Sequence, residues 1–99
     1  LAGRAELLRS SGRIDPAALR AERASAHPPL VLDVRTAREV AEGPIEGALA
    51  IPLDELEGRI HEVPRHEALV VTCRGGYRSS IAIGVLERSM RHLLVPFLI

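Results

Sequence analysis

The sequence has one cysteine, two aromatic residues and no excess of either charge among its 99 residues. A single cysteine cannot form an internal disulfide, which is typical of proteins in a reducing compartment. Because Lys and Arg balance Asp and Glu and no block of like charge occurs, we expect no nucleic-acid or membrane partner. No apolar run approaches the roughly 20 residues of a membrane span, and the first residues lack the apolar segment of a signal peptide. These absences predict a cytoplasmic protein.

The length of the chain predicts one small domain, because about 100 residues leave no room for a second core. The sequence of residues 1–12 indicates a linker or the remnant of an upstream helix. The domain is therefore expected over 13–99. The start at Leu1 rather than Met and the atypical apolar end at 91–99 are typical of a segment of a longer protein. We expect this end to be covered by a parent-protein domain, a dimer partner or an unusual packing of its own.

Short apolar runs predict the strands. LVLDV and ALVVT show little polar alternation, which is typical of strands buried on both faces of a parallel sheet. ALAIPL is a shorter run that is limited by Pro52. Near the end, Pro96 disfavours a central strand, so residues 93–98 are expected to form an edge strand or an exposed tail. The first three strands are expected at 30–34, 68–72 and 48–53.

Helix-start signals alternate with these strands. The first is an Asp directly before a Pro, an N-cap followed by a favoured first helical residue. The second is a Thr-x-x-Glu capping box at Thr36 and Glu39. Strands that alternate with helices predict an α/β domain. The helices are expected after Asp15, over 37–42, from Asp54 to about residue 62, and from about Arg78 or Ser79 onward.

Hydrogen-bond donors and cations gather after the single cysteine, in the stretch CRGGYRSS. Two glycines allow consecutive backbone N–H groups to turn toward the Cys73 sulfur. Two arginines and the positive end of the next helix favour a thiolate, which makes Cys73 a candidate nucleophile. A structural cysteine beside a turn is the alternative, but such a turn has no reason to collect these groups around one sulfur. They belong to Arg74, Gly75, Gly76, Arg78 and Ser79.

This stretch resembles the active loop of the rhodanese-like domains, Cys-x-x-Gly-x-Arg-Ser/Thr. LDVR, GPIEGALAIPL and LVVTC are similar to the family's other landmarks in their order and spacing, over roughly residues 12 to 90. The resemblance implies a small, mostly parallel central sheet with helices on both faces. It also implies a thiosulfate sulfurtransferase-like enzyme that needs no cofactor. Pro44 departs from the family, which commonly has a histidine there.

The resemblance assigns roles to the loop residues. Cys73 accepts a sulfane sulfur as a persulfide from a small anionic donor such as thiosulfate, and cyanide or a thiol then removes it. Arg74 is placed to attract the donor, whereas Arg78 is expected to tie loop carbonyls to the helix start. Tyr77 either walls the pocket or packs outside it. The implied substrate-binding residues are Arg74, Gly75, Gly76, Tyr77, Arg78 and Ser79.

Two other functions stay open at this point. A binding or regulatory module with this fold, appended to another enzyme, would keep the loop with little turnover of its own. A cysteine phosphatase is disfavoured, because such enzymes have five residues between Cys and Arg, whereas four separate Cys73 from Arg78. The shorter loop is expected to fit a sulfur atom and to crowd out a tetrahedral phosphate.

Asp33 and Arg35 stand at the carboxyl end of a predicted strand, the edge where ligands bind in open α/β sheets. We expect both to border the pocket, with Asp33 as a buried acceptor that orders the neighbouring loops. Arg35 is four residues from Glu39, so a surface ion pair is expected between them. The histidines lack the spacing of metal ligands, so no metal site is expected. They are His27, His61, His66 and His92.

Overall fold

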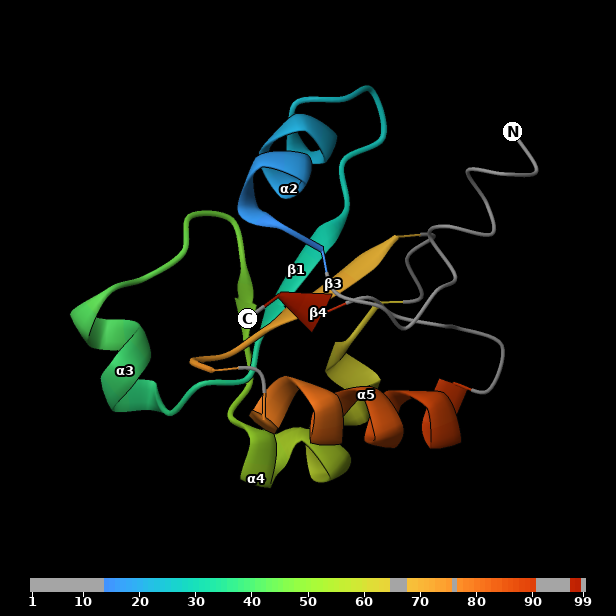
Figure 1. The fold of residues 1–99 in the computed structure, drawn as a ribbon. Helices are drawn as coiled ribbons and strands as arrows, with labels where there is room; N and C mark the ends of the chain where they lie inside the picture. Colours follow the sequence, from blue (N-terminus) through green and yellow to red (C-terminus); the bar gives the residue numbers. More distant parts are fainter. Residues whose placement is uncertain (1–13, 65–67, 76, 91–96, 99) are drawn as a thin grey trace.

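The computed structural model describes residues 14–64, 68–75, 77–90 and 97–98, which form one parallel β-sheet with helices on both faces (Figure 1). The strand order is β2-β1-β3-β4, and each neighbouring pair is parallel. The predicted fold class is therefore confirmed. The strands are β1 (Leu30–Asp33), β2 (Leu49–Ala50), β3 (Leu69–Thr72) and β4 (Phe97–Leu98).

Some predictions concern residues that the structure does not describe. The linker expected at 1–12, Gly76 and positions 91–96 and 99 lie outside the described residues. Phe97–Leu98 pairs with the end of β3 and is the edge strand β4. Of the two alternatives for the C-terminal end, the edge strand is confirmed at these positions.

The helices lie on both faces of the sheet (Figure 1). Helix α2 (Pro16–Arg23) covers one face, and α4 (Leu53–Leu56), the 3-10 helix η1 (Glu57–Glu62) and α5 (Tyr77–Met90) cover the other. Helix α3 (Ala37–Glu42) follows β1 and lies beside the carboxyl ends of the strands (Figure 1). None of the helices in the described part of the chain is long and apolar enough to cross a membrane.

Alternation along β1 and β3 sends side chains into two apolar layers. Val31 and Val70 pack with Leu19 of α2 on one face of the sheet. Leu32 and Val71 belong to a larger cluster on the other face. All four residues of β3 are buried, as the uninterrupted apolar run predicts. The helices contribute Leu56, Ala82, Ile83 and Leu86 to the larger cluster.

The helix starts agree with the sequence at two places and differ at a third. The Asp15 carboxylate accepts a hydrogen bond from the Ala18 N–H at 2.9 Å, and the capping box of Thr36 is complete. The helix that we expected to start at Asp54, with the Asp54 side chain as its cap, starts at Leu53 instead; Pro52 is at the N-cap position and there is no side-chain cap. Burial decides this start: Leu53, at the first helical position, packs against the core.

Replacing Leu32 with Ala is expected to lower the free energy of unfolding by about 2–5 kcal/mol. The reason is that Leu32 is fully buried on the central strand β1. Ile81→Ala is the matched control, since Ile81 is 41% exposed and its truncation leaves no cavity in the core. Urea unfolding of both variants measures the difference, and equal losses would contradict this assignment of the core.

Candidate active site

The sulfur of Cys73 lies directly after β3, against the first turn of α5. The backbone N–H of Ser79, the third residue of α5, donates to Cys73 Sγ at 3.2 Å. The thiol donates to Ser79 Oγ at 3.4 Å. Cys73 is 5% exposed and Ser79 is fully buried. The sulfur is therefore both buried, as a structural cysteine would be, and held by a helix-start donor, as the loop pattern predicts.

The loop after Cys73 turns through a left-handed glycine. Gly75 has φ +87°, a backbone conformation that residues other than glycine rarely adopt. Helix α5 then begins at Tyr77, slightly before the predicted start. Tyr77 is 76% exposed and is not among the pocket-lining residues, so of its two expected positions it takes the one outside the pocket.

Asp33 and Arg35 form a closely bonded pair at the carboxyl end of β1. The carboxylate of Asp33 is fully buried and accepts from the Arg35 backbone N–H at 3.1 Å and from its Nη2 at 2.8 Å. Arg35 Nη2 also donates to the Gly43 carbonyl at 2.8 Å. The hydrogen bond to Asp33 raises the pKa of Arg35. Asp33 is thus the buried acceptor that was expected.

The expected surface pair between Arg35 and Glu39 is wrong. A buried carboxylate needs a partner more than an exposed one does, and Asp33 takes the Arg35 guanidinium. Glu39 instead accepts from Arg78 Nη1 at 2.6 Å and from Nη2 at 3.0 Å. The guanidinium of Arg78, which we expected on loop carbonyls, therefore joins α5 to α3.

Glu39 also closes the capping box of its own helix. Its Oε1 accepts from the N–H and the hydroxyl of Thr36, both at 3.0 Å. The hydrogen bonds from Arg78, and then those from Thr36, hold the pKa of Glu39 well below its usual range. This carboxylate therefore links the cap of α3 to the first turn of α5, where the donor to the sulfur lies.

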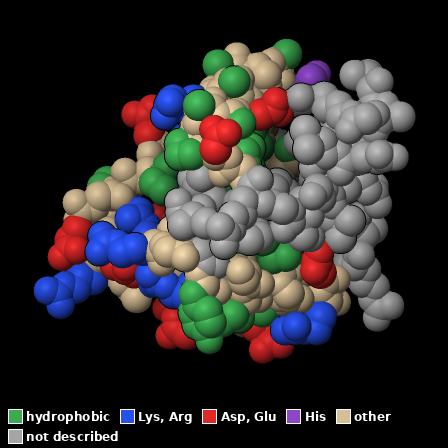
Figure 2. All heavy atoms as spheres, in the orientation of Figure 1, with side chains coloured by type: hydrophobic (Ala, Val, Ile, Leu, Met, Phe, Trp, Pro, Cys, Tyr) green, Lys and Arg blue, Asp and Glu red, His purple; other side chains and the backbone are tan. Residues whose placement is uncertain are grey.

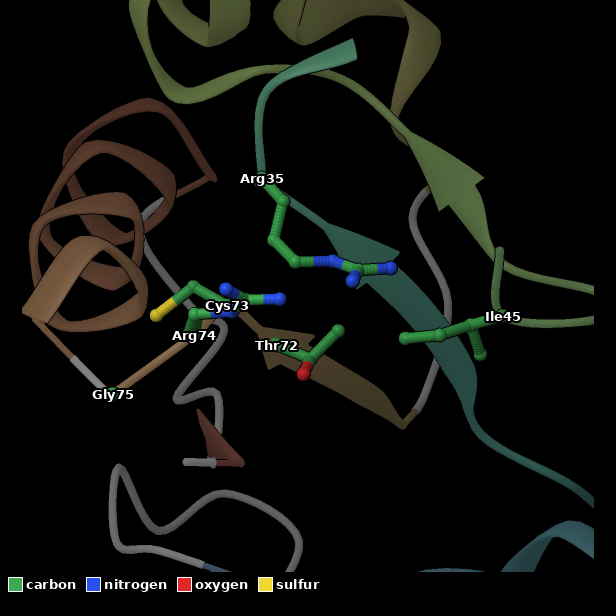
Figure 3. Close-up of a pocket in the computed structure, with 6 residues that line it drawn as sticks. All are labelled: Arg35, Ile45, Thr72, Cys73, Arg74 and Gly75. Carbon is green, nitrogen blue, oxygen red and sulfur yellow. The ribbon is translucent and has the colours of Figure 1, made fainter. Parts of the chain in front are cut away.

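A pocket of about 380 Å³ has Cys73 in its lining, and the Cys73 sulfur points toward α5 and away from Thr72 and Ile45 (Figure 3). In the view of Figure 3, the guanidinium groups of Arg35 and Arg74 lie between Cys73 and Ile45, and the sulfur is on the side of α5. In the described part of the chain, no group of three His, Cys, Asp or Glu side chains gathers as a metal site. The pocket is lined by Arg35, Ile45, Thr72, Cys73, Arg74 and Gly75.

The pocket brings together only some of the residues expected there. Asp33 is bonded to Arg35 but is not a lining residue, and neither Arg78 nor Ser79 lines the pocket. Sequence reasoning missed Thr72, although its place directly before the cysteine was a usable signal. It also missed Ile45, for which the sequence offers no comparable signal.

Ile45 is positioned by contacts between segments that are distant in the sequence. It belongs to the loop after α3 and packs with the apolar layer beneath α2. In this loop, the Glu46 carbonyl accepts a hydrogen bond from the Arg23 guanidinium, and Gly47 has φ +78°. Helix α2 therefore supports one wall of the pocket.

The sequence of the chain is similar to that of a known protein family and of two curated proteins. The family model of the rhodanese-like domain matches residues 15–97. A sulfurtransferase of Allochromatium vinosum is 36% identical over 73 residues, 74% of this chain and 68% of that protein. A putative sulfur carrier protein of Bacillus subtilis is 33% identical over 58 residues, and the match covers 59% of this chain but only 31% of that protein.

Solved structures share the fold. The human single-domain sulfurtransferase superposes with a TM-score of 0.73 at 28% identity, covering 90% of this chain and 89% of the human one. The sheet and helices described above are therefore those of a rhodanese-like fold.

Glu39→Gln is expected to lower stability most near neutral pH. The folded-state pKa of Glu39 is lowered from its ordinary value of 4.5. The contribution of the Glu39 carboxylate to the free energy of unfolding is therefore complete above pH 4.5 and is lost as the pH falls below that value. Urea unfolding of the wild type and the variant over a pH series measures this difference. Glu42→Gln is the control, since that side chain is 63% exposed. A difference between the wild type and Glu39→Gln that does not change with pH would contradict the assignment.

Gly75→Ala is expected to destabilise the protein by about 1–2 kcal/mol, the cost of a left-handed conformation for a residue with a Cβ. A Cβ at Gly75 would meet nothing within 4 Å, so the cost comes from backbone strain and not from a clash. Gly58→Ala is the matched control, because it has the same open space without a positive φ. Thermal unfolding of the two variants separates strain from packing; similar results would argue against strain at Gly75.

Proposed function

The chain belongs to the rhodanese-like domain family, and from this premise we propose that it is a sulfurtransferase that carries a sulfane sulfur as a persulfide on Cys73. The observation that carries the proposal is the Cys73 sulfur, held by the Ser79 N–H at 3.2 Å beside a pocket that two arginines line. A helix-start donor and nearby cations stabilise a thiolate and, after transfer, the negative charge of a persulfide.

Loading of the sulfur requires the Cys73 thiolate and a sulfur donor. The Cys73 thiolate attacks the outer sulfur of a donor such as thiosulfate and forms a new S–S bond. The bond between the two sulfur atoms of thiosulfate breaks, and sulfite leaves with its electron pair. Arg74, which lines the pocket, is placed to attract the anionic donor through its guanidinium.

Unloading reverses the roles of the sulfur atoms. An acceptor such as cyanide or a cellular thiolate attacks the outer sulfur of the persulfide. The bond to Cys73 Sγ breaks, and the cysteine leaves as a thiolate, so electrons and charge balance over the cycle. The N–H of Ser79 stays within hydrogen-bond distance of Sγ at the start and end of this cycle.

Two observations argue against a cysteine phosphatase. The loop has four residues between Cys73 and Arg78, one fewer than such enzymes use. In addition, both terminal nitrogens of Arg78 are bonded to Glu39, so they face a carboxylate and not an incoming phosphate.

A binding or regulatory module is the second candidate, and the burial of Cys73 is the observation that favours it. With 5% of the residue exposed, a large donor cannot reach the sulfur unless the loop opens. In such a module the loop would serve recognition, and the cysteine would not turn over.

Incubation with thiosulfate is expected to add one sulfur atom to the intact mass of the wild type and none to Cys73→Ser. Because Cys73 is the only cysteine in the sequence, the adduct has one site. Addition of cyanide is then expected to remove the adduct and to release thiocyanate. Ser25→Ala is a control for handling, since the Ser25 hydroxyl donates to the Glu22 carbonyl and Ser25 does not line the pocket.

The second candidate predicts a different result. If the wild type gains no sulfur from thiosulfate or from an organic persulfide in the absence of reductant, the sulfurtransferase proposal fails and the binding module replaces it. If the adduct forms but cyanide does not remove it, the chain stores sulfur without transferring it to this acceptor.

A further inference from the structure

Of the arginines in the described residues, Arg35 and Arg74 line the candidate pocket, and Arg78 contacts the same carboxylate as Arg74, that of Glu39. Arg35 and Arg78 are each closely paired with a carboxylate. Arg35 makes side-chain bonds to Asp33 at 2.8, 3.0 and 3.1 Å. Arg78 bonds to Glu39 at 2.6 and 3.0 Å. Arg74 differs, because its side chain is 74% exposed and its Nε lies 4.0 Å from Glu39 Oε2, at the limit of an ion pair. Arg74 is thus the least neutralised of the three.

The carboxylate of Glu39 holds one fixed negative charge between two of these arginines. Thr36 orients it through two hydrogen bonds to Oε1, and Arg78 binds both oxygens. Hydrogen bonds from Arg78 and Thr36 lower the pKa of Glu39, so it is an anion at neutral pH. Figure 2 shows basic and acidic side chains interspersed at the α3 end of the molecule.

We propose that Glu39 is a positioning residue that sets the charge which the Cys73 pocket presents to an anion. It holds Arg78 in a two-bond pair away from the ligand and leaves Arg74, which lines the pocket, to meet the donor. The inference deepens the proposed function and, as far as sulfur donors are concerned, rests on it. In this proposal the Arg74 guanidinium alone recognises the donor. The site would therefore favour a donor that carries one anionic group facing Arg74.

The two members of the pair are expected to act in opposite directions. Glu39→Gln removes the negative charge and releases Arg78, so the pocket attracts anions more strongly. Arg78→Gln leaves the Glu39 carboxylate with Arg74 as its nearest guanidinium in the described residues, so Glu39 draws Arg74 from the ligand and the pocket attracts anions less. A salt bridge that only stabilised the fold would give the same direction from either side, because each change breaks the same bonds.

Alkylation of Cys73 measures this charge without any sulfur transfer. The rate with anionic iodoacetate, divided by the rate with neutral iodoacetamide, cancels changes in sulfur reactivity that affect both reagents. We expect Glu39→Gln to raise this ratio and Arg78→Gln to lower it, each by about two- to fivefold, as for a partly exposed charge. The double variant is expected to return close to the wild type. In about 1 M salt, where the Debye length is about 3 Å, all differences should shrink.

Glu42→Gln is the matched control for the alkylation ratio. Glu42 lies on the same helix as Glu39, is 63% exposed and pairs with Arg38 at 3.6 Å, so its removal is expected to leave the ratio unchanged. Shifts of Glu39→Gln and Arg78→Gln in the same direction, or no shift in either, would overturn the proposal.

Two further results keep the test decisive. If circular dichroism shows that Glu39→Gln does not fold, Arg78→Gln and Arg74→Gln decide the matter: both must lower the ratio, and a wild-type ratio in either contradicts the proposal. Failure of the proposed function is separate, since a chain that forms no persulfide with thiosulfate still gives an alkylation ratio. The two hypotheses can therefore fail independently.

Discussion

The parallel pairing of β1 with β3, in one register, is the constraint on which the site depends. Asp33 stands opposite Thr72, and the N–H of Val34 donates to the Thr72 carbonyl at 3.0 Å. The two strands therefore end side by side, and β1 continues toward Arg35 while β3 continues into Cys73. A shift by one residue would turn every strand side chain to the opposite face. The same register thus fixes both the core and the meeting of the two loops.

Charge is retained at this edge because each buried polar group has a partner. Among the described residues, no buried side-chain nitrogen or oxygen lacks a hydrogen bond. Asp33 is fully buried, and Arg35 satisfies it; Glu39 is satisfied from two helices. Loss of Arg35 would leave an uncompensated charge on the buried Asp33, which costs more than the pair contributes. The two pairs therefore make the geometry of the loops specific.

Local rules predicted what is local in this protein. Apolar runs located β1 and β3, and the Thr-x-x-Glu spacing located α3, because each pattern involves residues a few positions apart. The pairing of Arg78 with Glu39 spans 39 positions, and only the fold brings these residues together. The spacing of Arg35 and Glu39 is compatible with a helix pair, but the nearby buried Asp33 prevails. Ile45 escaped detection for the same reason, since α2 determines its position.

Under the proposed function, the enclosure of Cys73 has a consequence for the lifetime of a sulfur atom that it carries. A persulfide decays when a second thiol attacks it, and an internal attack is the fastest route because the two groups are tethered. This sequence contains no other cysteine, so that route is closed within it. With 5% of the residue exposed, free thiols would also reach a sulfur carried by Cys73 slowly. In the proposed cycle, a sulfur atom on Cys73 would thus be kept until a molecule small enough for the pocket arrives, and its delivery would be governed by access and not by intrinsic reactivity.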